Sequence, residues 1–229
     1  MSDFHIELAH QKIGLHSNLP FWISMLSQSK KILPRNKVFD ILDFGCGDGY
    51  FLQIIDLFLD FDYALGVDID KDLICQIKSK NNNTKIHYIY DDEQNKKLQK
   101  TKKSFDIIYS QEVLYTMQNL KYHAQMAFDI LKNKGFYFAT MGCYIENPYF
   151  QKRREIIKKD SKYSIYDYSL NEVVDIFYNV GFEVCIKKLP MEYFAVYSKS
   201  ISKSFGSMLD LVNHCSDYKM LFCFYKDIA

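Results

Sequence analysis

Short apolar runs that are rich in β-branched and aromatic residues alternate along this chain with stretches of helical periodicity. Runs of this length and composition predict buried strands. Strands that alternate with helices predict an α/β fold, in which a mostly parallel sheet of about seven strands carries helices on both faces. The predicted strands fall at 38–44, 64–67, 86–90, 105–109, 136–141, 183–189 and 220–225.

Two of the helices between these strands are visible in the residue pattern. Apolar residues in 119–132 recur at spacings of three and four, which places them on one face of a helix. In 169–181, Ser169 and Glu172 have the spacing of a capping box, and Gly181 is a typical helix terminator. Both segments are therefore predicted to be helices that flank strands.

The length of 229 residues, with 48% apolar content, suits one core better than two, so we expect a single domain over 1–229. Two stretches do not fit the alternation: 1–37 precedes the first strand, and 190–219 separates the last two strands by more than a hairpin needs. Long connections often act as lids or binding loops. We therefore predict an N-terminal helical lid or acceptor segment, a core at 38–189, a lid-like insertion, and the last strand in 220–229.

The charge balance limits the partners of this protein. A formal net charge of +1, from 29 basic and 28 acidic residues, disfavours duplex nucleic acid or an anionic membrane surface as a partner. The six cysteines include no Cys-x-x-Cys pair, and no apolar run approaches the roughly 20 residues of a membrane helix. These features predict a soluble, cytoplasmic protein that acts on a small molecule.

The stretch ILDFGCGDGY, residues 41–50, places three glycines at alternate positions directly after an apolar run. Glycine tolerates positive φ and has no Cβ, so such a turn can present backbone N–H groups to a ligand. In a parallel sheet the ligand binds beyond the carboxyl ends of the strands, where the first strand turns into its helix. A dinucleotide fingerprint would need glycine at position 50, and Tyr50 stands there, which weakens the NAD interpretation.

The pattern Asp43-x-Gly45-x-Gly47-x-Gly49 resembles the first motif of class I S-adenosylmethionine (SAM) dependent methyltransferases. The resemblance covers about residues 38–189 and implies a Rossmann-like sheet of seven strands whose last strand is antiparallel. Its further motifs follow in order along the chain: LGVDI ending at Asp68, IHYIY leading into Asp91 and Asp92, SFDIIYSQEVLYTM, and AFDILKNKGFYFATMG.

The resemblance implies SAM as the cofactor, S-adenosylhomocysteine (SAH) as the product, and no metal. In the family the glycine loop wraps the methionine half of SAM, and an acid at the position of Asp68 accepts hydrogen bonds from the ribose hydroxyls. A carboxylate at Asp91, with Asp92 as a close second, meets the adenine amino group. The residues assigned to the cofactor in this way are Asp43, Gly45, Cys46, Gly47, Gly49, Asp68, Ile69, Asp91, Asp92, Ser110 and Gln111.

Methyl transfer from a sulfonium is an in-line displacement in which the protein supplies position and electrostatics. An amine acceptor needs only a free lone pair, whereas a hydroxyl acceptor needs a base to remove its proton. Glu112 and Tyr115 follow the fourth predicted strand, near the expected methyl group, and His16 and His214 lie in the two lid segments. Glu112, Tyr115 and His16 are the catalytic candidates, and His214 is a further candidate base.

The acceptor site is expected to draw on 10–25, 141–168 and 190–219. Aromatic side chains can hold an amine by cation–π contact, and paired arginines can clamp a phosphate or carboxylate. This predicts a small polar metabolite as acceptor, with an anionic or phosphorylated group as an extension of that prediction. The alternative is that the aromatic residues pack the core and the arginines face water. The candidate substrate residues are Trp22, Tyr144, Arg153 and Arg154.

Two other functions are open at this stage. The acceptor could be RNA or a protein, although the near-neutral charge is evidence against RNA. The chain could also be a catalytically inactive methyltransferase-like scaffold or partner subunit, because fold alone does not establish activity. The intact Asp43, Asp68 and glycine loop are evidence against such decay.

Overall fold

The computed structural model of the protein describes residues 3–14, 16–92, 97–160, 163–191, 193–195, 197 and 205–228. Within these residues, one sheet of seven strands has the order β3-β2-β1-β4-β5-β7-β6. The pairs β1–β2, β1–β4, β2–β3 and β4–β5 are parallel, whereas β7 is antiparallel to both β5 and β6. The predicted Rossmann-like fold with an antiparallel last strand is therefore confirmed. The strands are β1 Phe39–Phe44, β2 Phe61–Asp68, β3 Ile86–Tyr90, β4 Phe105–Gln111, β5 Leu131–Met141, β6 Glu183–Lys188 and β7 Met220–Tyr225.

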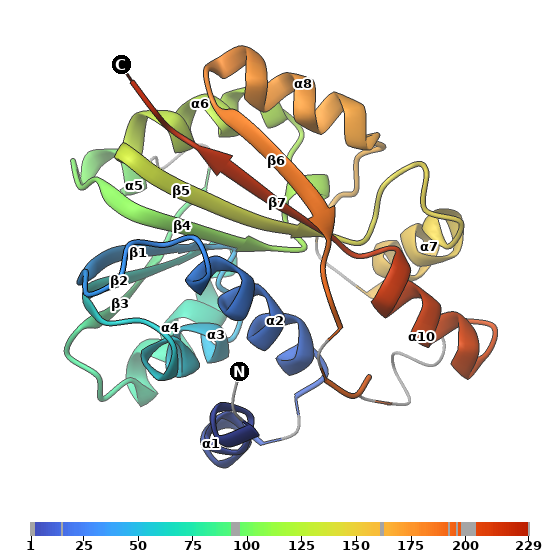
Figure 1. The fold of residues 1–229 in the computed structure, drawn as a ribbon, viewed down its shortest axis with the longest axis horizontal. Coiled ribbons are helices and arrows are strands. Elements are labelled where there is room, and N and C mark those ends of the chain that lie inside the picture. The colour runs from blue at the N-terminus through green and yellow to red at the C-terminus, as the bar shows by residue number, and fades with distance from the viewer. Residues whose placement is uncertain are drawn as a thin grey trace.

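Helices cover both faces of this sheet (Figure 1). One face carries α2, α3 and α4, with α1 packed outside them, and the other carries α5, α6 and α8. The last two helices, α7 and α10, lie beyond one end of the sheet, on the right in Figure 1. The bounds are α1 Asp3–Ile13, α2 Leu19–Lys30, α3 Tyr50–Ile54, α4 Lys71–Lys80, α5 Lys97–Lys100, α6 Leu120–Ile130, α7 Phe150–Asp160, α8 Leu170–Val180 and α10 Met208–Asp217, with 3₁₀ turns η1 at Ile55–Leu57 and η2 at Leu114–Thr116.

Each face of the sheet has its own hydrophobic core, because successive strand residues point to opposite sides. In β1, Ile41 packs with Trp22 of α2 in one core. The next residue, Leu42, packs with Ala124 of α6 and Phe177 of α8 in the other. The long apolar runs of the sequence follow from this burial on both faces.

The start of β5 differs from its prediction. The helical pattern predicted a helix to residue 132 and a strand from 136, but α6 ends at Ile130 and β5 begins at Leu131. The polar residues of this stretch hide the strand, because Lys132 is exposed enough to pair with Asp40 at 2.6 Å and Asp106 at 2.8 Å. Hydrophobic periodicity does not detect a strand whose first residues include polar ones such as the ion-paired Lys132.

Both long connections contain helix. The N-terminal segment holds α1 and α2, as predicted, and the insertion 190–219 holds α10. Residues 192, 196 and 198–204 of that insertion lie outside the described residues, so its role as a lid stays a prediction. In the described part of the chain, no helix combines the length and the apolar character needed to cross a membrane.

Candidate active site

A groove opens at the carboxyl ends of β1 and β4. These strands are adjacent and parallel, and the strand order reverses between them, which is where ligands bind in open α/β sheets. The groove consists of a wide cavity of about 480 Å³, a central cavity of about 200 Å³ and an inner cavity of about 220 Å³. The wide and central cavities share Phe44 and Tyr163, and the central and inner cavities share Gly45, Gly47 and Glu112. The three cavities are therefore continuous.

The glycine loop between β1 and α3 borders the central and inner cavities. Gly45 and Gly47 have φ values of +77° and +52°, which favour glycine. A Cβ at Gly45 would overlap the side chain of Val113, whereas a Cβ at Gly47 would meet no heavy atom within 4 Å. Gly45 thus permits close packing of the loop on the chain after β4, and Gly47 leaves the groove open. Gly49 caps α3 and faces Tyr88.

Asp68, at the end of β2, holds the glycine loop in place. Its Oδ2 accepts a hydrogen bond from the Gly47 N–H at 2.9 Å, and its Oδ1 accepts one from the Asp70 N–H at 2.9 Å. The Tyr163 hydroxyl lies 3.4 Å from the same Oδ1. Asp68 and the exposed Ile69 both line the central cavity, which makes the Asp68 carboxylate a fixed acceptor beside the groove.

The carboxylate of Asp43 is the most unusual group of the site. It is 1% exposed, lines the inner cavity, and has no hydrogen-bond partner for either oxygen among the described residues. Burial, followed by the nearby charges of Asp68 and Asp48, raises its pKa well above the usual range. A buried carboxylate without a partner costs free energy, and a cation in the inner cavity would offset that cost.

Asp91 and Asp92 lie at the far end of the groove. Asp91 accepts hydrogen bonds from the N–H groups of Lys97 at 2.7 Å and Leu98 at 2.8 Å, so it also caps α5. Asp92 accepts a hydrogen bond from the Tyr90 hydroxyl. Both aspartates line the wide cavity. Along the groove, from the inner to the wide cavity, the acidic residues therefore lie in the order Asp43, Asp68, then Asp91 with Asp92.

His123, on α6, forms part of the wall of the wide cavity. Its Nε2 lies 2.8 Å from the Tyr137 hydroxyl, and its Nδ1 is buried without a partner among the described residues. Burial lowers its pKa from 6.5 to about 4. The ring is therefore neutral in the folded protein at neutral pH.

Acid is expected to destabilise the protein through His123. The unfolded chain takes up a proton near pH 6.5 and the folded chain near pH 4, so stability present above pH 6.5 is lost as the pH falls to 4. The loss is about 3 kcal/mol in the free energy of unfolding. It is measured by urea unfolding between pH 7 and 4.5, with His123→Phe as the reference that removes the titration. Equal pH slopes in the two proteins would contradict the assignment.

Glu112 lies where the central and inner cavities meet. Its φ of +58° is rare outside glycine and marks a strained backbone directly after the end of β4. Oε2 accepts a hydrogen bond from the Gly142 N–H at 3.1 Å, and Oε1 lies 3.2 Å from Lys219 Nζ. Gln111, the last residue of β4, lines the same two cavities. Glu112 is therefore a fixed, partly exposed carboxylate at the centre of the groove.

Lys219 was missed by the sequence analysis. It is 4% exposed, lines the inner cavity and lies 3.7 Å above the Phe21 ring, in addition to its ion pair with Glu112. Burial is the largest influence on the pKa of Lys219 and lowers it. The Glu112 charge raises this pKa and the Arg153 charge lowers it, and the net shift is downward. A signal was available: Lys219 directly precedes an antiparallel strand, whose beginning lies at the carboxyl ends of the parallel strands.

The structure separates the remaining predicted residues into two groups. Trp22 and Cys46 line the inner cavity. The Trp22 ring stacks on the ring of His16, with 4.7 Å between the ring centroids. Nδ1 of His16 accepts a hydrogen bond from the Asn18 N–H at 3.1 Å, and its Nε2 lies 3.4 Å from Asp48. His16 is thus engaged on both nitrogens. Burial raises the pKa of the Cys46 thiol, which makes it unreactive.

Ser110, Tyr115 and Tyr144 do not line any of the three cavities. All three are buried, and Ser110 of β4 lies between Phe44 of β1 and Ala139 of β5 in the sheet. Burial, then the Glu112 charge, raises the pKa of Tyr115 well above its usual range. Tyr115 therefore stays protonated at neutral pH, and the prediction that it is a catalytic base is not supported by its environment.

The predicted arginine pair is split. Nη2 of Arg153 lies 4.0 Å from Glu112, whereas Nε of Arg154 lies 3.0 Å from Asp167. The two residues are consecutive on α7, and consecutive helical side chains point in different directions. The structure therefore gives the two arginines different carboxylate partners and does not bring them together as a clamp. Within the described part of the chain, no cluster of three His, Cys, Asp or Glu side chains has the arrangement of a metal site.

The sequence profile of a family described as "Methyltransferase domain" matches residues 21–156, which is more than half of the chain. The matched region contains the glycine loop, Asp68, Asp91 and Glu112. A comparison with curated proteins found no match.

Several solved structures are similar to this chain. A methyltransferase from Haloferax volcanii, in complex with the methyltransferase activator Trm112, has 14% identity and a TM-score of 0.74, covering 99% of this chain and 97% of that one. A SAM-dependent methyltransferase from Mesorhizobium loti has 16% identity and a TM-score of 0.64, with coverages of 92% and 98%. Phosphoethanolamine N-methyltransferase 2 from Haemonchus contortus, in complex with SAM, has 16% identity and a TM-score of 0.66, with coverages of 98% and 56%. At these identities the likeness shows the fold.

Proposed function

The chain belongs to the class I SAM-dependent methyltransferase family, and we propose that it transfers the methyl group of SAM to an amine or hydroxyl of a small polar acceptor. A near-neutral net charge of +1 favours a small acceptor over nucleic acid. The six cysteines, which include no Cys-x-x-Cys pair, support the proposal of a cytoplasmic location.

The observation that carries this proposal is the unpartnered carboxylate of Asp43 beside the open glycine loop. SAM has an ammonium group on its methionine half, and this cation would complete the pairing of Asp43 in the inner cavity. The rest of the cofactor then extends along the groove, with the ribose hydroxyls at Asp68 and the adenine toward Asp91 and Asp92. The residues proposed to line it are Asp43, Gly45, Cys46, Gly47, Asp68, Ile69, Asp91, Asp92 and Gln111, while Gly49 shapes the loop.

SAM supplies a methyl carbon that is already activated by its sulfonium, so the protein does not need to generate an electrophile. The chain contributes a fixed loop and a fixed set of carboxylates, which orient the reactants for in-line displacement. Glu112 lies where the central and inner cavities meet, which is where acceptor and cofactor would approach each other.

Glu112 is the proposed proton acceptor for a hydroxyl substrate. Of the three catalytic candidates, Tyr115 is held protonated by its burial and His16 is engaged on both nitrogens. Glu112 is the remaining group that borders the groove with a carboxylate. An amine substrate would need no base in the transfer step, and Glu112 would then orient the amine by a hydrogen bond.

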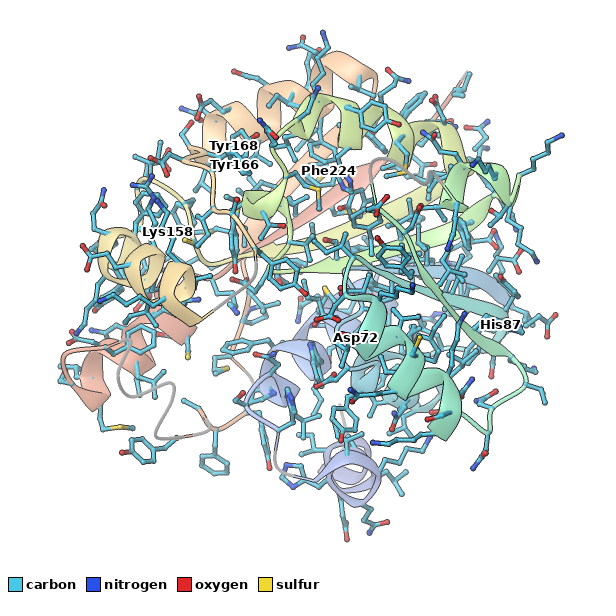
Figure 2. The ribbon with its side chains drawn as sticks, turned by 180° about the vertical axis from the view of Figure 1, so that it is seen from behind. Asp72, His87, Lys158, Tyr166, Tyr168 and Phe224 are labelled. Atoms are coloured by element: carbon cyan, nitrogen blue, oxygen red, sulfur yellow. The ribbon has the colours of Figure 1, made fainter. Side chains whose placement is uncertain are left out.

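The first test is thermal unfolding with and without saturating SAH. SAH at 100 times its dissociation constant should stabilise the wild type by about 2.7 kcal/mol. Asp68→Ala should reduce the shift, because it removes both the proposed ribose acceptor and the hydrogen bond to the Gly47 N–H. Asp72→Ala is the matched control, since Asp72 is exposed on the next helix (Figure 2) and should leave the shift unchanged. An absent shift in a cofactor-free wild type would refute the proposal.

Methyl transfer itself is tested by SAH release from SAM in the presence of a pool of small polar metabolites. The similar protein of Haloferax volcanii was solved in complex with an activator. The assay therefore uses the isolated chain, in order to ask whether this chain needs such a partner. Turnover by the isolated chain would show that an activator is not required. SAH binding without turnover in any pool would favour the scaffold alternative.

A further inference from the structure

Two cations lie close to Glu112 beside the inner cavity. Lys219 lines this cavity together with the carboxylates of Asp43, Asp48 and Glu112, whereas Arg153 lies 4.0 Å from Glu112 and does not itself line the three cavities. Lys219 and Arg153 contribute two cations, and Glu112 is the carboxylate within ion-pair distance of both. Arg154 does not enter this balance, because it pairs with Asp167 at 3.0 Å. Among Lys219, Arg153 and Glu112 there are therefore two cations and one carboxylate, and Asp43 is the further carboxylate of the inner cavity.

Arg153 is the least satisfied member of the group. Its side chain is 16% exposed, its nearest carboxylate oxygen is 4.0 Å away, and its Nε is buried without a hydrogen-bond partner among the described residues. The Phe205 ring lies on one side, 5.7 Å from Cζ. A largely buried guanidinium that has an unsatisfied Nε, and whose carboxylate partner among the described residues lies at 4.0 Å, is matched by a planar or tetrahedral oxyanion.

A histidine adds a further polar atom to this end. His214, on α10, is 2% exposed, and its Nε2 has no partner among the described residues. A Cβ built on Gly142 would lie 3.1 Å from this Nε2 and 3.2 Å from Glu112 Oε2, so the two side chains face the same backbone position. Nδ1 of His214 lies 3.3 Å from the Asn147 amide nitrogen. The Arg153, Lys219 and His214 side chains thus surround Glu112 from α7, the start of β7 and α10.

These residues lie on the β5 and β7 side of the groove, whereas the groups proposed for SAM lie on the β1 and β2 side. Resting on the proposed function, we infer that the acceptor carries an oxyanion, a carboxylate or a phosphate, that binds Arg153 and Lys219 next to the methyl transfer centre. Glu112 separates this oxyanion from the reacting amine or hydroxyl. The acceptor is therefore a small molecule with a nucleophilic end and an acidic end.

The test is the thermal stability of the full chain in saturating SAH at constant ionic strength, with sodium chloride replaced stepwise by inorganic phosphate or by malonate. Saturating SAH occupies the cofactor part of the groove, so its own shift reports on the proposed function separately. We expect at least one of the two oxyanions to raise the midpoint in a saturable way. Phosphate alone would indicate a phosphorylated acceptor, and malonate alone would indicate a carboxylate.

Arg153→Gln should weaken the apparent affinity for the stabilising oxyanion about tenfold or more, because a charged hydrogen-bonding partner is lost. The matched control is Arg154→Gln, on the same helix, which should keep the affinity of the wild type. Without added oxyanion, Arg153→Gln should be at least as stable as the wild type, since it removes a guanidinium whose Nε is buried without a hydrogen-bond partner among the described residues. Arg153→Lys provides a second variant that keeps the charge, and an intermediate affinity is expected because the bidentate fork is lost.

Three results would overturn this inference while leaving the SAH shift intact. The first is no effect of either oxyanion on the wild type. The second is an equal loss in Arg153→Gln and Arg154→Gln, which would show non-specific binding to α7. The third is an oxyanion effect that occurs without SAH and disappears when SAH is added, because the cations would then hold the carboxylate of the cofactor.

Discussion

Replacing Asp43 by asparagine is expected to stabilise the unliganded protein and to weaken its binding of SAH. The carboxylate is buried without a partner, and its raised pKa means that the folded state resists its ionisation. Asparagine keeps the shape and removes the charge, so the free energy of unfolding at neutral pH should rise by about 1–3 kcal/mol. The SAH ammonium would lose its counter-charge, and the dissociation constant should rise about 30-fold or more.

The pH dependence of Asp43→Asn provides a check on its sign. In the unfolded chain the carboxyl ionises near its usual pKa of 3.8, whereas in the folded chain it ionises at higher pH. The wild type therefore loses stability as the pH rises through this interval, and the variant does not. The gain from the substitution should be small near pH 4 and largest at neutral and alkaline pH. A variant that is less stable than the wild type at pH 8, or that binds SAH equally well, would refute the role of Asp43.

Replacing Glu112 by glutamine is expected to be one of the most destabilising single changes in this site. It leaves the Lys219 ammonium buried against the Phe21 ring, without the carboxylate that pairs with it. Loss of one partner of a buried ion pair costs about 3–5 kcal/mol. The cost at pH 7 cannot exceed about 5 kcal/mol, because the buried Lys219 can lose its proton instead of staying charged. Removing a proton from a lysine whose pKa in the unfolded chain is 10.5 costs about 5 kcal/mol at pH 7. Urea unfolding measures the loss.

The double variant Glu112→Gln with Lys219→Met should recover part of this loss. Lys219→Met alone should be less harmful than Glu112→Gln, since Glu112 is 20% exposed and keeps its hydrogen bond from the Gly142 N–H. Glu112→Gln should also gain stability from pH 7 to 9, because the unfolded lysine then holds more protons than the folded one. Additive effects of the two substitutions would show that the pair is not coupled.

The contrast between Asp43→Asn and Glu112→Gln would separate effects on binding from effects on folding. Asp43 is expected to lower the stability of the unliganded protein at a place where a cation would bind, which is typical of groups that serve a ligand. Glu112 and Lys219 form an ion pair that lines the inner cavity, beside the proposed place of the reaction. A residue that serves ligand binding can therefore be recognised when its replacement raises the free energy of unfolding of the unliganded protein and weakens binding.

The sequence by itself determined the order of the elements and the cofactor end of the groove. The central strands β1 and β4 are buried on both faces, so their apolar runs are visible in isolation. The glycine loop then follows the first strand directly. Asp43, Asp68, Asp91 and Asp92 were predictable for the same reason, since each is attached to the end of a strand whose position in the sheet is set by the fold. Such residues depend on local sequence and on topology alone.

Only the tertiary structure decided which residues meet at the acceptor end. Lys219, Arg153 and His214 come from three elements that are far apart along the chain from Glu112, and their contacts depend on how α7 and α10 pack beyond the sheet. Helical direction separated Arg153 from Arg154, and burial removed Tyr115 from the candidate bases. Charge pairing and desolvation are properties of neighbours in space, so no pattern in the linear sequence could specify them.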